Sequence, residues 1–447
     1  MKISIRKSYR LIWLVAAVFG TSAWMSGPVA RADTLEELKM QIQALQQKVE
    51  ALEKQQVEAK KVVASVEQPA PKKASQKGYF VIPGTDTEMK IGGYVKLDGI
   101  YSNKSAGDGS DANQFFVPSA IPLNNDPNSK NGETVFQARQ SRINLATTSD
   151  TPFGKFKTFF EGDFFGGAGG AGKQDVSNSY EFRLRHAYGE LGNLLAGQTW
   201  STFQILDSLP ETLDFGGPAA QIFVRQAQVR WTEPFNWGSL QFAVENPNTT
   251  YLTSGGVKSE ADNDHMPDMV GRVNLNSAYG SYSLAMMGRQ LRWDNGAQSD
   301  ETWGGAASLG GRIPTFGKDD IRFQINYGNA LGRYMWTGFA DVTLNQKLQN
   351  PQISALNQWG GFVGYRHFWM DTLRSNLIYS YGEADNDLNV VPNTVNRQFQ
   401  SVHANLIWSP IPKIDLGIEY LYGYRELENS HEGDLNRVQV SATYNFF

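Results

Sequence analysis

The sequence predicts an all-β protein, a 16-stranded antiparallel transmembrane β-barrel preceded by a short N-terminal α-helical coiled coil. Three observations support this prediction. From Gly78 onward, apolar and polar residues alternate with a period of two, which places one face of each strand in an apolar medium and the other against water. The connections between these segments alternate between short and long, as they do in outer-membrane barrels. A secretory signal precedes the alternating region.

The composition excludes several other classes of protein. None of the 447 residues is a cysteine, which excludes a disulfide scaffold, a zinc–cysteine site and a thiol nucleophile. The net charge of −4 gives no whole-chain basis for nucleic-acid binding. The sequence is mildly polar on average and has no long apolar run after residue 25, which excludes a bundle of membrane-spanning helices. A membrane barrel stays open, because alternating strands average to a mildly polar sequence.

Residues 1–32 have the three parts of a secretory signal peptide. Basic residues precede the apolar run Leu11–Phe19, and Ala30-Arg31-Ala32 forms an A-x-A cleavage site before Asp33. An uncleaved anchor helix is the alternative, but the apolar run is short and small residues follow it. We therefore expect an exported protein.

Residues 33–61 carry an a/d heptad seam, which predicts a helix that associates with copies of itself. The seam consists of Leu35, Leu38, Ile42, Leu45, Val49, Leu52, Gln56 and Ala59. Ile42 and Val49 do not fix the number of copies, and a lone solvated helix is the alternative. Residues 62–77 are rich in Pro, Ala and Lys and predict an extended linker.

Residues 78–447 form the predicted barrel domain. In its last strand, Val438, Val440 and Ala442 alternate with polar residues. The segments are 89–102, 134–148, 153–165, 180–191, 193–202, 221–233, 237–246, 267–277, 280–291, 300–313, 319–329, 355–369, 371–383, 396–409, 412–427 and 435–447. Residues 340–348 could add a strand piece within a loop. Because the count is even, both ends of the barrel should lie on the periplasmic side.

Aromatic residues at the strand ends predict girdles at the two membrane interfaces. They are Tyr101, Trp231, Trp237, Phe368, Trp369, Trp408 and Tyr444. The terminal Phe447 resembles the assembly signal of bacterial outer-membrane proteins. A soluble β-sandwich array is the alternative, but it does not need loops that alternate in length.

The alternation also sorts charge, with basic residues predominantly on the inward face. Sixteen basic residues have inward parity, against six acidic ones: Asp98, Glu161, Asp163, Glu245, Asp415 and Glu419. Nine of the basic residues are expected to line the solute path: Lys96, Arg142, Arg183, Arg185, Arg230, Arg272, Arg289, Arg322 and Arg366. The other seven are Lys90, Lys155, Lys157, Arg312, Arg374, Arg425 and Arg437. A basic lumen concentrates anions and repels cations, and arginine binds carboxylate with two parallel hydrogen bonds.

The alternative interpretation is that these cations neutralise lumen acids and pin strands, but six acids cannot neutralise sixteen bases. Arg139 and Arg225 have outward parity, which indicates a bulge or a buried subunit interface.

The loop Thr202–Ala220 is unusually apolar for an exposed segment. We expect it to fold into the lumen, as the corresponding loop does in porins, and to narrow it. There it would face a basic wall built from Arg142, Arg183, Arg185, Arg230 and Arg272. Its own side would be apolar or mildly acidic through Asp207, Glu211, Asp214 and Phe215. Packing at a subunit contact is the alternative.

The sequence contains few motifs that would indicate catalysis or cofactor binding. The five histidines have no spacing that suggests a triad, and the sequence contains no P-loop and no G-x-G-x-x-G opening a helix. The acidic loop residues Asp262, Asp264 and Asp268 could hold calcium, but solvated loop charges are the better interpretation. We therefore expect no enzyme activity, no cofactor and no resident metal.

Several short motifs together resemble the DcaP-like trimeric porins of Gram-negative bacteria. They are Phe80–Thr85, Lys90–Lys96, Gln140–Asn144, Glu161–Gly166, Arg183–Gly189 and Gly197–Ser201, after a signal peptide, a heptad helix and a linker. The resemblance implies a sixteen-stranded barrel, a homotrimer, a periplasmic coiled coil, and diffusion of small anions such as dicarboxylates. Outer-membrane lipid and lipopolysaccharide would surround it.

The sequence as a whole predicts a passive, anion-preferring porin of the outer membrane. A sugar or nonspecific porin is the first alternative, and it would need aromatic tracks along the lumen, whereas most aromatic residues here have outward parity. An outer-membrane lipase or protease would need a nucleophile or paired carboxylates that the sequence does not show. A closed barrel tethered to the cell wall by its coiled coil is the third alternative.

Overall fold

The computed structural model describes residues 33–65, 74, 76–105, 111–124, 126–127, 129–167, 177–261 and 263–446. The predicted signal peptide (1–32), most of the predicted linker (62–77) and the terminal Phe447 lie outside these residues. The chain divides after Pro71 into two compact units, the N-terminal helix in one and the barrel in the other.

The N-terminal unit contains one helix, α1 (Asp33–Ser65), which ends four residues after the predicted Lys61. Four apolar residues of the heptad seam, Ile42, Leu45, Val49 and Leu52, are half or more exposed along this helix. The side chains of Leu35, Leu38 and Ala59 lie outside the described part. The helix is therefore confirmed, and the coiled coil stays a prediction. Within the described residues, no helix has the length of apolar sequence needed to cross a membrane.

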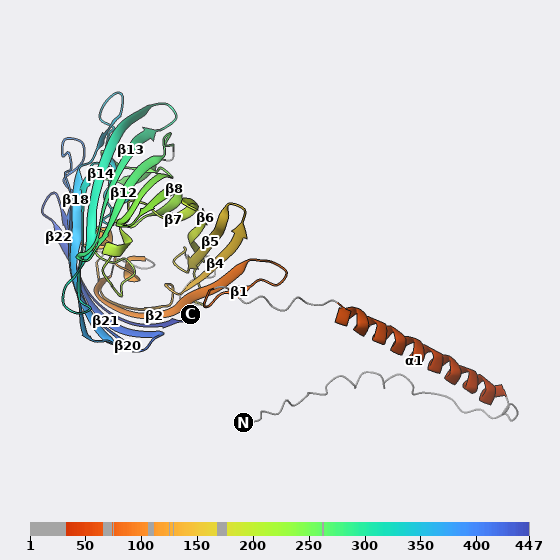
Figure 1. Cartoon of the computed structure of the whole chain (residues 1–447). Coiled ribbons are helices and arrows are strands. Elements are labelled where there is room, and N and C mark those ends of the chain that lie inside the picture. Colours follow the sequence, from red (N-terminus) through yellow and green to blue (C-terminus); the bar gives the residue numbers. More distant parts are fainter. Residues whose placement is uncertain are drawn as a thin grey trace, which may run out of the picture. The chain divides into compact units, whose positions relative to one another are not determined.

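The second unit is a closed antiparallel barrel of sixteen strands (Figure 1). The strands are β2 (Glu88–Ser105), β4 (Arg142–Thr151), β5 (Gly154–Asp163), β6 (Arg183–Leu191), β7 (Leu194–Trp200), β8 (Arg225–Phe235), β9 (Gly238–Glu245), β12 (Asp268–Ser277), β13 (Gly280–Asp294), β14 (Ser299–Pro314), β15 (Asp320–Gly328), β18 (Gln358–Met370), β19 (Leu373–Ala384), β20 (Asn396–Ile411), β21 (Ile414–Leu427) and β22 (Glu432–Asn445). The first and last strands close the barrel by pairing from Tyr94↔Asn445 to Ser102↔Arg437. Every predicted segment carries a strand, so the predicted number is confirmed.

The second predicted segment is broken into two strands. A turn over residues 138–141, in which the Ser141 amide donates to the Ala138 carbonyl at 3.0 Å, separates β3 (Lys130–Gln137) from β4. The start of β2 pairs with β4 and the end of β2 pairs with β3. The break buries Arg139, which donates to the Phe164 and Gly166 carbonyls. The irregularity that its outward parity indicated is therefore confirmed.

A second irregularity lies between β5 and β6. The register shifts between Glu161 and Gly162, so that Arg185 has no partner on β5. Arg185 and the next residue, His186, are consequently both buried instead of pointing to opposite faces.

The outward face of the barrel is apolar. Val95, Leu97, Phe242, Val244 and Ile325 are exposed there at every second position of their strands. Six of the predicted girdle residues are about half exposed: Tyr101, Trp231, Trp237, Trp369, Trp408 and Tyr444. This is the surface that strands in contact with lipid require.

A small sheet is built from the long loops. It contains β10 (Thr249–Thr253), β11 (Lys258–Ala261), β16 (Val342–Asn345) and β17 (Gln352–Ala355) in the order β11-β10-β16-β17. The strand piece expected within residues 340–348 is β16. The remaining short elements are β1 (Phe80–Val81), η1 (Asp111–Asn113), η2 (Pro118–Ala120) and η3 (Leu206–Ser208).

The apolar core of this unit lies inside the barrel, because long loops pack against inward-facing residues of the strands. Three connections contribute: β2 to β3, β7 to β8, and β15 to β18. The loop members are Phe116, Ile121, Phe203, Ala219, Ala220, Ile222, Ala330, Leu331, Tyr334, Met335, Phe339 and Leu356. They meet Phe399, Leu421 and Leu435 on the strands, so folded loops fill part of the lumen.

Candidate functional site

The loop between β7 and β8 crosses the lumen to strands far from its own in the sheet. The Leu213 amide donates to the Glu419 carboxylate on β21 at 2.8 Å, and Lys96 on β2 donates to the Leu213 carbonyl at 2.7 Å. Arg322 on β15 donates to the Leu209 carbonyl at 2.5 Å. The loop therefore lies within the barrel, as expected, and is held by strands on both sides of the closing seam.

The acidic residues of this loop are directed to partners away from the basic wall. Glu211 accepts two hydrogen bonds from Arg374 at 2.8 and 2.6 Å. Asp214 accepts from the Phe116 and Gly216 amides and lies 3.3 Å from Arg437. Burial raises the pKa of the Asp214 carboxyl, and Arg437 opposes this rise. The Asp207 carboxylate accepts from the Ser281 hydroxyl.

The loop presents apolar side chains to the lumen, with the neutral polar Gln204 and Thr212 among them. A cavity of about 710 Å³ separates it from the wall formed by β4 to β8 and β12. The loop contributes Leu206, Leu209, Pro210 and Phe215 to this cavity, together with the already paired Glu211 and Asp214. The wall was expected to be apolar or mildly acidic. It contains apolar residues, and its acids Glu211 and Asp214 are bound to Arg374 and Arg437.

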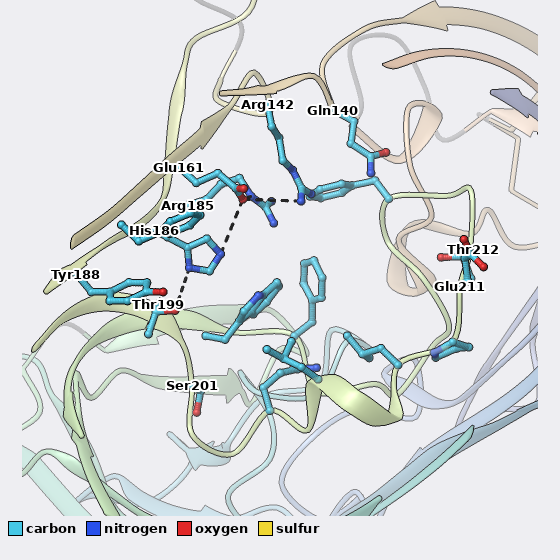
Figure 2. Close-up of a pocket in the computed structure, with 18 of the residues that line it drawn as sticks. Gln140, Arg142, Glu161, Arg185, His186, Tyr188, Thr199, Ser201, Glu211 and Thr212 are labelled. Atoms are coloured by element: carbon cyan, nitrogen blue, oxygen red, sulfur yellow. Dashed lines mark hydrogen bonds and ion pairs between the residues drawn. The ribbon is translucent and has the colours of Figure 1, made fainter. Parts of the chain in front are cut away.

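Four of the predicted arginines line the opposite wall of this cavity: Arg142, Arg185, Arg230 and Arg272. Figure 2 shows Arg142, Arg185 and His186 around Glu161, with Glu211 and Thr212 across the cavity. Arg183 is displaced toward the long-loop end, where its guanidinium lies 5.6 Å from the Phe215 ring centroid. The structure therefore brings the predicted basic wall together, with Arg183 at its edge.

The carboxylates on this wall are shared among several arginines. Asp163 lies 3.0 Å from Arg183 and 2.8 Å from Arg185, and Glu161 lies 2.7 Å from Arg185. Arg142 lies 3.8 Å from Glu161, which leaves it weakly paired. Arg185 is 3% exposed and fully engaged by the two acids, so it fixes the wall more than it faces solutes.

Three further arginines have no carboxylate partner within the described residues. Arg225 and Arg230 form no ion pair there, and each has a buried guanidinium nitrogen without a hydrogen-bond partner. Arg272 likewise pairs with no described acid, and it donates to the Thr202 and Gln204 carbonyls of the loop. Arg225, Arg230 and Arg272 are consequently cations beside the cavity that are not held in a direct ion pair with any described carboxylate.

Parity predicts that Arg225 faces outward, but in the structure its guanidinium lies against a residue of the cavity lining. Arg225 begins β8, where the chain leaves the loop, and its guanidinium lies 4.7 Å from the ring centroid of the cavity residue Trp200. Alternation is established only inside a strand, so it cannot place a first residue. The position of Arg225 directly after a long apolar loop is the sequence feature that could have identified it as a residue near the lumen.

The remaining predicted path residues are held in other ion pairs. Arg289 is fully buried between Asp268 at 3.0 Å and Asp341 at 2.6 Å. Arg322 and Arg366 both bind Asp320, with Arg322 at 2.8 Å, and Lys96 lies 3.2 Å from Asp98. These four are absent from the cavity lining. The count of six lumen acids was too low, because loop residues and the first residues of strands supply Asp214, Glu211, Asp268, Asp320 and Asp341 as partners.

The acidic loop offers no support for a calcium site. Asp268 is buried against Arg289 and Tyr334, whereas Asp264 accepts from the backbone and side chain of Thr249. Asp262 lies outside the described residues. Among the described residues, no group of three or more His, Asp or Glu side chains is arranged to hold a metal ion.

Comparison with known proteins gives both a family and a fold. The family model described as "DcaP outer membrane protein" matches residues 28–446. The outer membrane channel DcaP of Acinetobacter baumannii has a similar structure, with a TM-score of 0.66 and 22% identity over 80% of this chain and 97% of that chain. The anion-selective porin from Comamonas acidovorans superimposes with a TM-score of 0.50 and 14% identity over 80% of this chain and 100% of that chain. The search of curated proteins gave no match.

Proposed function

The chain belongs to the DcaP outer membrane protein family, and from this premise we propose that it is a passive diffusion channel that prefers small anions, dicarboxylates among them. Members of this family and the structural neighbours are channels of the outer membrane and not enzymes. The finer statement, anion preference, is supported by one observation. Arg230 and Arg272 line the cavity and Arg225 lies against its residue Trp200, and none of the three has a carboxylate partner among the described residues.

The proposed path runs along the β6–β9 sector toward the short turns. A second cavity of about 330 Å³ is lined by Glu190, Asn193, Thr232 and Gln241, and it shares Arg230 with the first. Arg230 would therefore pass an anion from the loop constriction to the mouth formed by the short turns. Because Arg230 forms no ion pair with a described carboxylate, it can bind a solute carboxylate without first breaking a protein ion pair.

We expect reversal potentials in a salt gradient to show a clear preference for anions at low salt. A charged, narrow lumen raises the local concentration of counter-ions about tenfold or more. The preference should weaken as salt rises, because screening shortens from about 8 Å at 0.15 M to about 3 Å at 1 M. Planar bilayers containing the purified protein measure both effects. A preference for cations at low salt would contradict the proposal.

A nonspecific or sugar porin remains the second candidate, and one observation favours it. The cavity lining includes Phe159, Tyr188, Trp200, Phe215 and Phe223, although most aromatic residues of the chain face outward. Three of these rings lie outside the interior of a strand: Trp200 is the last residue of β7, and Phe215 and Phe223 lie in the loop that follows. Strand parity does not predict the orientation of such residues. The argument from parity against a sugar porin therefore does not hold for this cavity.

We also propose that the protein is a homotrimer in the outer membrane, in contact with lipid and lipopolysaccharide, with α1 forming a coiled coil in the periplasm. The support is the exposed apolar seam of α1, which a single copy leaves in water. The alternative, a mainly structural protein tethered to the cell wall, also requires the helix to form a coiled coil. Measurement of conductance distinguishes it from a channel, because a closed barrel would not conduct.

Deletion of residues 33–73 should leave a trimer with lower heat resistance. The deletion removes the seam and leaves the barrel walls, so subunits would remain associated through the barrels alone. Native mass spectrometry and heat-dependent migration in gels measure the two properties. Full-length protein that is monomeric in detergent would refute the assembly proposal.

A further inference from the structure

The cavity presents three kinds of chemistry side by side, and arginine is only one of them. Partly exposed aromatic rings form the second kind. The Trp200 and Phe223 ring centroids lie 5.1 Å apart and those of Phe215 and Phe223 lie 5.9 Å apart. Both pairs are edge-to-face, at 62° and 88°, so each ring turns its face in a different direction along the lining. Linear dicarboxylates have no flat face to place against such a ring.

Neutral hydrogen-bonding groups are the third kind. Gln204 is fully buried and lines the cavity, and neither polar atom of its amide has a partner in the described structure. Tyr188 and Thr212 line the same cavity with hydroxyl groups. A buried amide with no partner favours a ligand that supplies both a donor and an acceptor, and a hydroxyl group does so.

We propose that this cavity selects cyclic sugar acids, of which the hexuronates are the simplest, and this deepening rests on the proposed anion channel. The C–H face of the sugar ring would pack on the face of one of these rings, Trp200, Phe215 or Phe223. Its carboxylate would be bound by Arg142, Arg230 or Arg272, and a ring hydroxyl by Gln204. A neutral sugar lacks the charge, an open-chain acid lacks the flat face, and a hydrocarbon diacid lacks the hydroxyls.

Bi-ionic reversal potentials of the full-length protein test this assignment with the sodium salts of glucuronate, gluconate and succinate. Glucuronate and gluconate carry the same charge, and only glucuronate has a ring. We expect glucuronate to be about fivefold more permeant than gluconate, as the gain from aromatic packing predicts. Equal permeabilities of the two anions would overturn the assignment.

Two variants separate the contributions of the ring and the hydroxyl groups. Trp200→Leu removes one stacking face, and Gln204→Leu removes the unpaired amide at nearly constant volume. Each should bring the glucuronate-to-gluconate ratio toward one. Trp303→Leu, on the exposed outward face, is the matched control and should leave all three values unchanged. Because Arg225 and Arg185 lie against Trp200, a variant at that position that fails to fold leaves Gln204→Leu as the deciding test.

The outcomes distinguish failure of this inference from failure of the channel proposal. A cation preference with all three salts refutes the anion channel. Anion preference with permeant succinate, combined with a glucuronate-to-gluconate ratio near one or unaffected by Gln204→Leu, refutes only the assignment of sugar acids.

Discussion

Replacing Arg183 and Arg185 together by alanine should weaken the proposed anion preference and slow dicarboxylate flux. These two side chains hold Asp163, and Arg185 also holds Glu161. Counting Arg142 with them, three cations and two carboxylates occupy this part of the wall, so the double substitution changes the local charge from +1 to −1. Glu161 and Asp163 would then be left with Arg142, which lies 3.8 Å from Glu161. Reversal potentials and dicarboxylate uptake into liposomes measure the change.

The matched control removes the same charge from other sectors. Arg312→Ala with Arg397→Ala leaves Asp320 paired with Arg322 and Arg366, and neither position lines the cavity. We expect this control to keep the parental selectivity. Breaking buried ion pairs costs about 3–5 kcal/mol of stability, so heat-dependent gel migration must show that both double variants are folded. Parental dicarboxylate flux in a folded Arg183/Arg185 double variant would place the solute path elsewhere.

Deletion of residues 207–216 should widen the channel and raise its conductance roughly twofold or more, since a sixteen-stranded barrel without an inward loop encloses an aqueous pore. The deletion removes the apolar side of the cavity and spares Phe203, Ala219, Ala220 and Ile222, which hold the base of the loop in the core. It also frees Arg374 and Arg437 from Glu211 and Asp214. The preference for anions should therefore persist while discrimination by size is lost.

Single-channel recording with polymers of graded size measures this widening. Removal of Gly296 and Ala297 from the turn between β13 and β14 serves as the control, because this turn is exposed and absent from the cavity lining. Conductance that stays at the parental value after the 207–216 deletion would show that the loop does not set the constriction.

The sequence predicted the regular part of this molecule well, because alternation is a direct consequence of strands that separate lipid from water. It located each of the sixteen strands and the loop that enters the lumen. It did not predict where alternation fails. The register shift beside Gly162 turns both Arg185 and His186 inward, so parity did not identify His186 as a residue of the candidate site. Arg225 is the first residue of β8, and parity assigned it to the wrong face.

Ion pairs between residues that are distant in the sequence were the second feature that the sequence did not predict. Arg289 has inward parity, as predicted, but its ion pair with Asp341 joins a strand to a loop 52 residues later. The same holds for Arg374 and Glu211, which are 163 residues apart. These ion pairs decide which arginine and lysine side chains remain available to solutes. The periodicity of the sequence does not predict the pairs.

The apolar core that the long loops build inside the barrel has a consequence for how such a channel evolves. Loops that each stand alone at the surface can change length independently. Here, the loops after β2, β7 and β15 share one packed interior through Phe116, Phe203 and Tyr334, so an insertion in one of them disturbs the other two. Adaptation to a new solute is therefore easiest by single replacements on the cavity wall, and lineages of this channel should diversify in lining residues before they diversify in the length of these three loops.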